Sequence, residues 1–230
     1  MGINNKIAVF FDCENVSAKF VKEIFDELAN YGEVSIRKAY TNWSDKKSKY
    51  WHNKLREFAI EAIQVFPNIL NKNSSDIKMV IDVMNTMNTS KIDTVVLVSS
   101  DSDFTDLVID IKAKGFEVIG FGETKTVKSL RNAYSTFIEL PIKDQSVSSN
   151  EKDLIITLTD AINKTKNDND YALISKVGTY LKNKNASLVA KNYGANTWGD
   201  IFKRYPKNFE LTHEDNRKSI CIVKIKNSDI

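Results

Sequence analysis

Short apolar runs alternate, over the first 142 residues, with segments whose apolar positions recur every three or four residues. Each run predicts a buried strand, and each helically spaced segment predicts an amphipathic helix. Strands are expected at 6–12, 33–40, 61–66, 93–100, 116–122 and 136–140. Repeated strand, helix, strand units with nearly continuous apolar strands indicate a parallel sheet covered by helices on both faces. The expected fold class is therefore α/β, a three-layer sandwich with a mainly parallel sheet.

Four predicted helices separate these strands, and their apolar positions define the faces expected to point inward. The first runs from Phe20 to Leu28 and stops at Gly32, and the last, with Phe104 and Ile111, closes at Gly115. The second is expected to bury Trp51, Leu55, Phe58 and Ala62. The third, capped by Ser74 or Ser75, is expected to bury Ile77, Val80, Ile81 and Met84.

The composition changes after Pro141. The stretch KDQSVSSN has no core residue except Val147, so residues 143–149 are interpreted as a linker between a domain at 1–142 and a second domain at 150–230. The second domain contains two helically spaced apolar stripes, a short helix around Trp198 to Tyr205, and the strand-like CIVKIK. Helices followed by a short strand pair predict a small winged-helix domain.

The net charge of +3 hides a division between the two parts of the chain. Residues 1–142 contain 18 Lys and Arg against 19 Asp and Glu, whereas residues 143–230 contain 15 against 11. The basic second part is compatible with nucleic-acid binding. Because no stretch approaches the roughly 18 to 20 apolar residues of a membrane span, and MGINNKIAVFFD lacks the zones of a signal peptide, we expect a cytoplasmic protein without a membrane partner.

The two cysteines, Cys13 and Cys221, lie outside any CxxC or Cys/His pattern. A disulfide framework or a zinc site is therefore not expected. We interpret both residues as reduced and partly buried, and a reactive thiol at Cys13 is the minor alternative.

Carboxylates follow two of the predicted strands at the point where each strand ends. Asp12 ends the first strand, and Ser100, Asp101 and Asp103 come at the end of DTVVLVSS or just after it. The carboxyl ends of parallel strands share one edge of a sheet, and ligands bind there. If these two strands are neighbours, three carboxylates meet at that edge, and Asp76 at the start of the third helix lies near it.

Four like charges in one place repel each other and favour protonated carboxyls unless a cation lies between them. Oxygen ligands select hard ions, so Mg²⁺ or Mn²⁺ is the expected cofactor. Such ions lower the pKa of an attacking water and neutralise charge on a phosphate, which is the chemistry of phosphodiester hydrolysis. An Asp after one strand is more often a cap or turn former, but the second strand, with SSDSDF, favours a metal site.

Asp82 is open to two interpretations. It follows Asp76 by six residues and so lies about 240° further round a helix, where both cannot easily point at one ion. We expect Asp82 either to support the metal ligands from behind or to pair with a lysine. Asp106 and Asp110 are expected to face solvent.

Residues 37–56, RKAYTNWSDKKSKYWHNKLR, combine seven Lys and Arg residues with one acidic residue and four aromatic residues, Tyr40, Trp43, Tyr50 and Trp51. Basic side chains neutralise phosphates, and aromatic rings stack on unpaired bases. Because the segment starts where a predicted strand ends, part of it should border the carboxylate edge. We expect nucleic acid to pass along Arg37, Lys46, Lys47 and Lys49. The alternative is a solvated basic loop with Trp51 in the core.

The order of DCEN, SDIKMVID, VVLVSSDSDFTDLV, GFEVIGFG and SLRNAYSTFIEL, over residues 5–141, resembles the NYN domain, a branch of the PIN-like nuclease superfamily. The resemblance implies a PIN-like α/β sandwich that binds Mg²⁺ or Mn²⁺ and cleaves RNA, with endonucleolytic cleavage favoured. By position it makes Asp12, Asp76, Asp101 and Asp103 metal ligands.

The same resemblance extends to polar residues around these ligands. Asn15 would orient a ligand or a phosphate oxygen, with turn formation as the alternative. Ser100 would contact phosphate or cap the helix that follows. Many members of the family have an acidic residue where Ser135 stands, so any support that this residue gives to the site is missing here.

Residues 150–227 resemble the LOTUS domain, also called OST-HTH, a winged-helix module often attached to NYN domains. The stretches YALISKVGTYLKNKN and VAKNYGANTWGDIFKRYPKNFEL carry the resemblance. It implies binding of single-stranded or structured RNA, or docking of a partner protein. Tyr193, Gly194 and Trp198 match family positions, and core packing is the favoured role of the two aromatic residues.

Other functions fit the sequence less well than a metal-dependent ribonuclease. A phosphatase of the haloacid dehalogenase class needs a second Asp two residues after the first, and that position is Glu14, without the following Thr. A nucleotide oxidoreductase needs a GxGxxG after the first strand, and none follows. The serious alternative is a catalytically silent RNA-binding or scaffold protein that keeps the fold.

Overall fold

The computed structural model describes residues 5–66, 74–142, 151–214 and 220–226. The predicted linker at 143–149 lies outside the described residues. The chain divides into two compact units, Met1–Pro141 and Ile142–Ile230, and each unit has a sheet of its own.

Six parallel strands form the sheet of the first unit, in the order β3, β2, β1, β4, β5, β6. They are β1 (Lys6–Asp12), β2 (Glu33–Thr41), β3 (Glu61–Gln64), β4 (Thr94–Val98), β5 (Glu117–Glu123) and β6 (Thr136–Leu140). β4 is buried along its whole length, and β1 is buried after its first residue. Such strands require cover on both faces, so the predicted α/β class is confirmed.

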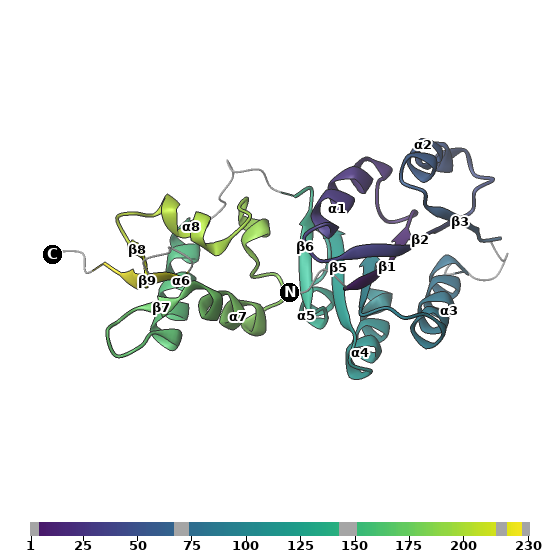
Figure 1. Ribbon diagram of the computed structural model, residues 1–230. Helices are drawn as coiled ribbons and strands as arrows, with labels where there is room; N and C mark the ends of the chain where they lie inside the picture. The colour runs from purple at the N-terminus through teal and green to yellow at the C-terminus, as the bar shows by residue number, and fades with distance from the viewer. Residues whose placement is uncertain (1–4, 67–73, 143–150, 215–219, 227–230) are drawn as a thin grey trace. The chain divides into compact units, whose positions relative to one another are not determined.

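Helices cover both faces of this sheet, with α1 and α2 on one side and α3 and α4 on the other (Figure 1). The helices of the unit are α1 (Val21–Leu28), α2 (Lys49–Glu57), α3 (Ser74–Thr89), α4 (Thr105–Ala113) and α5 (Lys128–Ala133). Short 3₁₀ helices precede three of them: η1 (Ala18–Phe20), η2 (Lys46–Ser48) and η3 (Ser102–Phe104).

Helix α2 is shorter than its apolar spacing predicts. It ends at Glu57, and Ala59 adopts a left-handed conformation with φ of 49°. Ala62, which was expected on the buried face of this helix, lies in β3. The chain must turn at Ala59 to enter the sheet, so the helical spacing of apolar residues extends beyond the helix itself.

Helix α3 buries a different face from the one predicted. Met79, Val83 and Met87 point into the core, whereas Ile77 and Ile81 are 52% and 49% exposed. Apolar residues occur on both sides of this helix, so spacing alone does not decide which side packs. Contact with β1 and β2 decides it.

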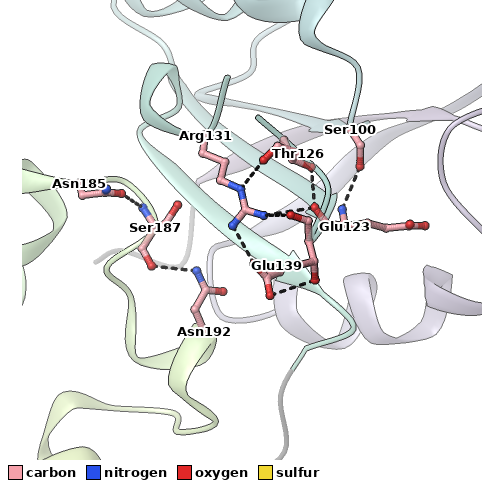
Figure 2. A network of polar contacts seen from close by, with 9 residues as sticks. Ser100, Glu123, Thr126, Arg131, Glu139, Asn185, Ser187 and Asn192 are labelled. Atoms are coloured by element: carbon pink, nitrogen blue, oxygen red, sulfur yellow. Dashed lines mark hydrogen bonds and ion pairs between the residues drawn. The ribbon is translucent and has the colours of Figure 1, made fainter. Parts of the chain in front are cut away.

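Helix α5 was not predicted from the apolar spacing. Its residue Arg131 holds the loop after β5 in place (Figure 2). The Arg131 guanidinium donates to the carboxylate of Glu139 at 2.7 Å and to the backbone carbonyls of Thr124 and Thr126 at 2.6 and 2.8 Å. Ser100 accepts a hydrogen bond from the backbone N–H of Glu123 at 2.9 Å. The loop is therefore tied to α5, to β6 and to the end of β4.

The described residues of the second unit form three α-helices, α6 (Glu151–Thr165), α7 (Ile174–Lys184) and α8 (Trp198–Arg204), and the 3₁₀ helix η4 (Ala190–Tyr193). Its antiparallel sheet has the order β7 (Ala172–Leu173), β9 (Cys221–Ile225), β8 (Phe209–His213). Leu158, Val177, Ile201 and Val223 join these elements in one core, and Trp198 packs against it. Helices packed on a small antiparallel sheet agree with the predicted winged helix.

Two further expectations concern cysteines and membranes. Cys13 and Cys221 are both free and partly buried. Burial and the Asp12 carboxylate raise the pKa of the Cys13 thiol well above its usual range, which disfavours a reactive thiolate. In the ranges that the structure describes, every helix is too short or too polar to cross a bilayer.

Gly120 of β5 leaves the space that the ring of Tyr134 fills. A Cβ atom at Gly120 would lie 2.4 Å from a carbon of this ring, and Tyr134 is 1% exposed and cannot move outward freely. We predict that Gly120→Ala lowers the free energy of unfolding of the first unit by roughly 1–3 kcal/mol, measured by urea denaturation.

Gly199→Ala in α8 is the control, because a Cβ there meets no atom nearer than 3.5 Å. This variant should keep or slightly raise the stability of the second unit, since Ala favours helix more than Gly does. Unchanged stability of Gly120→Ala would contradict the packing described for Tyr134.

Candidate active site at the carboxyl edge of the sheet

β1 and β4 lie side by side, and their carboxyl ends meet at the middle of the sheet. They pair in parallel from Ile7 with Thr94 to Phe11 with Val98, so Asp12 and Ser99 come next on the two strands. From here the strand order runs outward in both directions, to β2 and β3 on one side and to β5 and β6 on the other. Loops diverge at such a point and leave a crevice beyond the carboxyl ends of the strands.

Asp12 is a buried carboxylate held by four hydrogen bonds. Only 2% of the residue is exposed. Its Oδ2 atom accepts hydrogen bonds from Ser99 Oγ at 2.6 Å and from Asn15 Nδ2 at 2.8 Å. Its Oδ1 atom accepts from the backbone N–H groups of Glu14 and Asn15, both at 3.2 Å. Burial raises the pKa of Asp12, and the hydrogen bonds oppose this rise.

Asn15 combines the two roles that the sequence left open. Its side chain donates to Asp12, and its backbone N–H takes part in the turn that follows β1. Asn15 therefore both orients the Asp12 carboxylate, through its side chain, and forms the turn, through its backbone.

Ser99, which sequence reasoning did not select, lies at the centre of the site. This residue is fully buried, and its Oγ atom donates to Asp12 and accepts from the backbone N–H of Asp101 at 3.0 Å. Ser100 is directed elsewhere, to the loop after β5 (Figure 2). Consecutive residues at a strand end point to opposite sides. Because Ser99 and Ser100 are adjacent, only one of them can face Asp12. The sequence therefore offered Ser99 as an alternative to Ser100.

Asp76 lies in the first turn of α3, and the charges of the other carboxylates affect its pKa. Burial, followed by the charges of Asp12, Asp101, Glu14 and Asp103, raises the pKa of Asp76 to about 7. All of these influences act in the same direction. Asp12, Asp101 and Asp103 thus lie within electrostatic reach of Asp76.

Glu14 is a fifth carboxylate close to the site, and it was not among the predicted metal ligands. Burial and the charge of Asp12 raise its pKa, and hydrogen bonds from Ser75 and Thr41 oppose the rise. The charge of Asp45 acts on Glu14 as well, so the loop after β2 comes close to the site. Because Glu14 lies only two residues after Asp12, the sequence could have indicated that its carboxylate lies near the site.

The donor set fits a hard divalent cation in its chemistry, because it consists of carboxylate oxygens that repel one another. Within the described ranges, however, no three Asp, Glu, His or Cys side chains are placed to hold one ion. Asp12 uses both oxygens in hydrogen bonds, and Asp101 Oδ1 accepts from the backbone N–H of Asp103 at 3.0 Å, which caps η3. Side-chain rotation is required before these carboxylates close on a cation.

Asp82 pairs with lysines, which is one of its two predicted roles. Its carboxylate accepts hydrogen bonds from Lys78 Nζ at 3.0 Å and from Tyr40 Oη at 3.1 Å, and Lys38 Nζ lies 3.8 Å away. Asp82 lines a separate pocket of about 750 Å³ with Asn85 and other residues of β2 and α3.

Arg37 does not lie at the carboxylate edge, which corrects the predicted nucleic-acid path. It pairs with Val9, three residues before Asp12 and therefore about 10 Å further back along the strand. Its guanidinium donates to the carbonyl of Phe58 at 2.7 Å and packs over the ring of Phe25 at 5.0 Å. Arg37 thus joins β2 to the helices above it, and its charge is not available at the edge.

Ser135 also lies away from the site. Its Oγ atom accepts a hydrogen bond from the backbone N–H of Val118 at 3.3 Å, near the start of β5. The carboxylates gather at the opposite ends of the strands. Position 135 therefore lies at the amino end of β6 and not at the carboxyl edge of the sheet.

The remaining basic residues of the predicted path follow the carboxyl end of β2. Lys46 and Lys47 lie in η2 and Lys49 begins α2, and all three are exposed. Helix α2 is anchored by Trp51, whose ring packs against Phe11 at 5.7 Å between centroids. The charge of Asp45, which caps η2, acts on Glu14, so the turn that carries Lys46 and Lys47 comes close to the carboxylate edge.

Comparisons with known proteins agree with the two units. The family model of the NYN domain matches residues 6–142, and that of the OST-HTH/LOTUS domain matches residues 145–221. A crystal structure of a protein of unknown function from Vibrio parahaemolyticus RIMD 2210633 is similar, with a TM-score of 0.51 and 24% identity. The similarity covers 61% of this chain and 95% of that chain, and it concerns the fold alone. No match was found among the curated proteins.

The raised pKa of Asp76 makes the stability of the metal-free protein depend on pH. In the folded state this pKa is about 7, above the ordinary value of 3.8. The stability that the protonated group contributes is present below about pH 4 and is lost as the pH rises through 7. In EDTA at pH 8, we predict that Asp76→Asn is more stable than the parent by on the order of 1 kcal/mol, a value reduced for the partial exposure of the group.

Urea denaturation at pH 5 and pH 8 measures this difference, which should shrink at the lower pH. Asp110→Asn is the control, because Asp110 is partly exposed and pairs with Lys114 at 2.6 Å. A lower stability of Asp76→Asn than of the parent at pH 8 would show that the carboxylates do not repel one another.

Proposed function

This chain belongs to the NYN domain family, with an OST-HTH/LOTUS domain after its NYN domain, and on that basis we propose that it is a metal-dependent ribonuclease. NYN domains form part of the PIN-like nuclease superfamily. The proposed reaction is hydrolysis of RNA phosphodiester bonds within the strand. The observation that carries the proposal is that Asp12, Asp101, Asp103 and Glu14 follow the carboxyl ends of the neighbouring strands β1 and β4, and that their charges all act on Asp76 at the start of α3.

Asp12, Asp76 and Asp101 would hold the metal, with Asp103 as a further ligand. Mg²⁺ or Mn²⁺ supplies, when bound, an activated water and positive charge for the phosphate and the leaving oxygen. The chain's own contribution is to hold these oxygens in place. Ser99 and Asn15 hold Asp12 at the end of β1, and Asp12 would exchange at least one of these hydrogen bonds for the metal.

The lysines at the start of α2 would bind the substrate backbone. Lys46, Lys47 and Lys49 are exposed beside the carboxylate edge. Their positive charges offset the repulsion between RNA phosphates and the acidic site, and the affinity for substrate should therefore fall with rising salt.

The second unit would retain RNA, as expected of an OST-HTH domain. Trp198 packs closely against Gly178, where a Cβ atom would lie 2.9 Å from the indole, and Tyr193 packs beside it. These rings therefore serve the core, in agreement with the role favoured by the sequence. Lys203 and Lys207, both exposed around the end of α8, are the proposed contacts with phosphates.

A catalytically silent RNA-binding or scaffold protein is the second candidate. The observation that favours it is that Asp12 engages both oxygens in hydrogen bonds, while the described residues contain no three ligands placed around one point. The two candidates differ in whether RNA is cleaved when Mg²⁺ or Mn²⁺ is added.

Cleavage of a circular single-stranded RNA with Mn²⁺ or Mg²⁺ tests the proposal, since a circle has no ends for an exonuclease. We predict linear products with metal and none with EDTA. Asp12→Asn and Asp101→Asn should each reduce the rate more than about 100-fold, the scale on which loss of one electrostatic stabiliser acts.

Asp110→Asn is the matched control and should keep the parent rate, because this carboxylate pairs with Lys114 on α4. Thermal melting of each variant establishes that it is folded. Full activity in Asp12→Asn, or cleavage that survives EDTA, would refute the metal assignment.

A further inference from the structure

Tyr50 is the aromatic residue of segment 37–56 that the structure leaves open to solvent. Tyr40 is fully buried, and Trp51 is 3% exposed. The indole N–H of Trp43 donates to the carbonyl of Ile63 at 2.9 Å, and its ring packs against an imidazole. Tyr50, in contrast, is 82% exposed. Of the four aromatic residues that the sequence offered for base stacking, Tyr50 is the one that is largely exposed.

A single exposed ring is common on protein surfaces, and its surroundings distinguish this one. Lys46, Lys47 and Lys49, all exposed, precede Tyr50 within five residues. Asp45, the acidic residue of the segment, is engaged as the cap of η2 and accepts from the backbone N–H of Lys47 at 2.9 Å. An aromatic face among several cations is the combination that binds unpaired nucleotides.

The segment that carries Tyr50 is fixed before any ligand arrives. Ser48 is buried, and its hydroxyl bonds the carbonyls of Trp43 and Asp45 at 3.0 and 2.7 Å. Gln64 of β3 accepts from the backbone N–H of Trp43 at 3.2 Å and donates to the side chain of Asn42 at 2.9 Å. A platform held in this way loses little conformational entropy when a base stacks on it.

The platform also lies near the carboxylates. Helix α2 starts after the carboxyl end of β2, where Tyr40 pairs with Asp12. Trp51, the neighbour of Tyr50, points inward and packs on Phe11, so Tyr50 points outward from the same turn of helix.

We propose that Tyr50 stacks on an unpaired base beside the cleaved phosphodiester while Lys46, Lys47 and Lys49 contact the adjoining phosphates, so that the protein selects single-stranded RNA over duplex RNA. The inference rests on the proposed function for the position of the scissile bond. Selection follows because the faces of paired bases are covered by their neighbours in a duplex, and a side chain on the protein surface cannot reach them.

Binding of a 5′-labelled RNA hexanucleotide to the full chain tests this inference, with EDTA present so that cleavage is not required. Tyr50→Ala should weaken binding of the single strand by about 5- to 150-fold, the range for loss of one stacked base. Tyr50→Phe should bind within about twofold of the parent, because stacking needs the ring and not the hydroxyl. Ile109→Ala, which removes another exposed apolar side chain of the same unit, should leave binding unchanged.

The same hexanucleotide annealed to its complement is the comparison ligand, and its affinity should not respond to Tyr50→Ala. With Mn²⁺ present, Tyr50→Ala should raise KM for the single strand by a similar factor while kcat stays within about threefold. Equal affinities of parent and Tyr50→Ala for the single strand, or equal losses for single strand and duplex, would overturn the inference. If only the nuclease proposal is wrong, the parent protein will bind the single strand in a Tyr50-dependent way but will not cleave it.

Discussion

A buried carboxylate is tolerated only where hydrogen bonds replace the water that it loses, and Asp12 at the carboxyl end of β1 meets this condition. Ser99 reaches it from β4 and Asn15 from the turn after β1, so two central strands and a loop are fixed to the same pair of oxygens. This places a carboxylate at the carboxyl ends of the two central strands. The charge of Asp12 raises the pKa of Asp76 and of Glu14. A bound cation would relieve this repulsion between the carboxylates.

The loops on both sides of this charge are held by contacts of their own. On the β5 side, Arg131 fastens the loop to α5 and β6, and Ser100 ties it to the end of β4 (Figure 2). On the β2 side, Ser48 and Gln64 fix the basic turn that leads into α2. The parallel sheet brings all these loops to one edge, and the local contacts give each of them a defined conformation.

The sequence predicts the six strands well because buried parallel strands are nearly continuous apolar runs. It predicts the inward face of α3 poorly, since Ile77 and Met79 both follow helical spacing and only contact with the sheet separates them. The carboxylates of the site could be found because each follows a strand or opens a helix. The role of Ser99 could not be predicted, because it depends on which way a residue at a strand end points. The position of Arg37 could not be predicted either, because it depends on how far along the strand the residue lies.

The central claim is that these carboxylates close around a hard divalent cation, and anomalous diffraction from crystals of the full chain soaked in Mn²⁺ tests it most directly. The expected result is a manganese peak between Asp12, Asp76 and Asp101, with at least two of them in direct coordination. A crystal in which Mn²⁺ binds only elsewhere, with Asp12 still in its present hydrogen bonds, would contradict the claim.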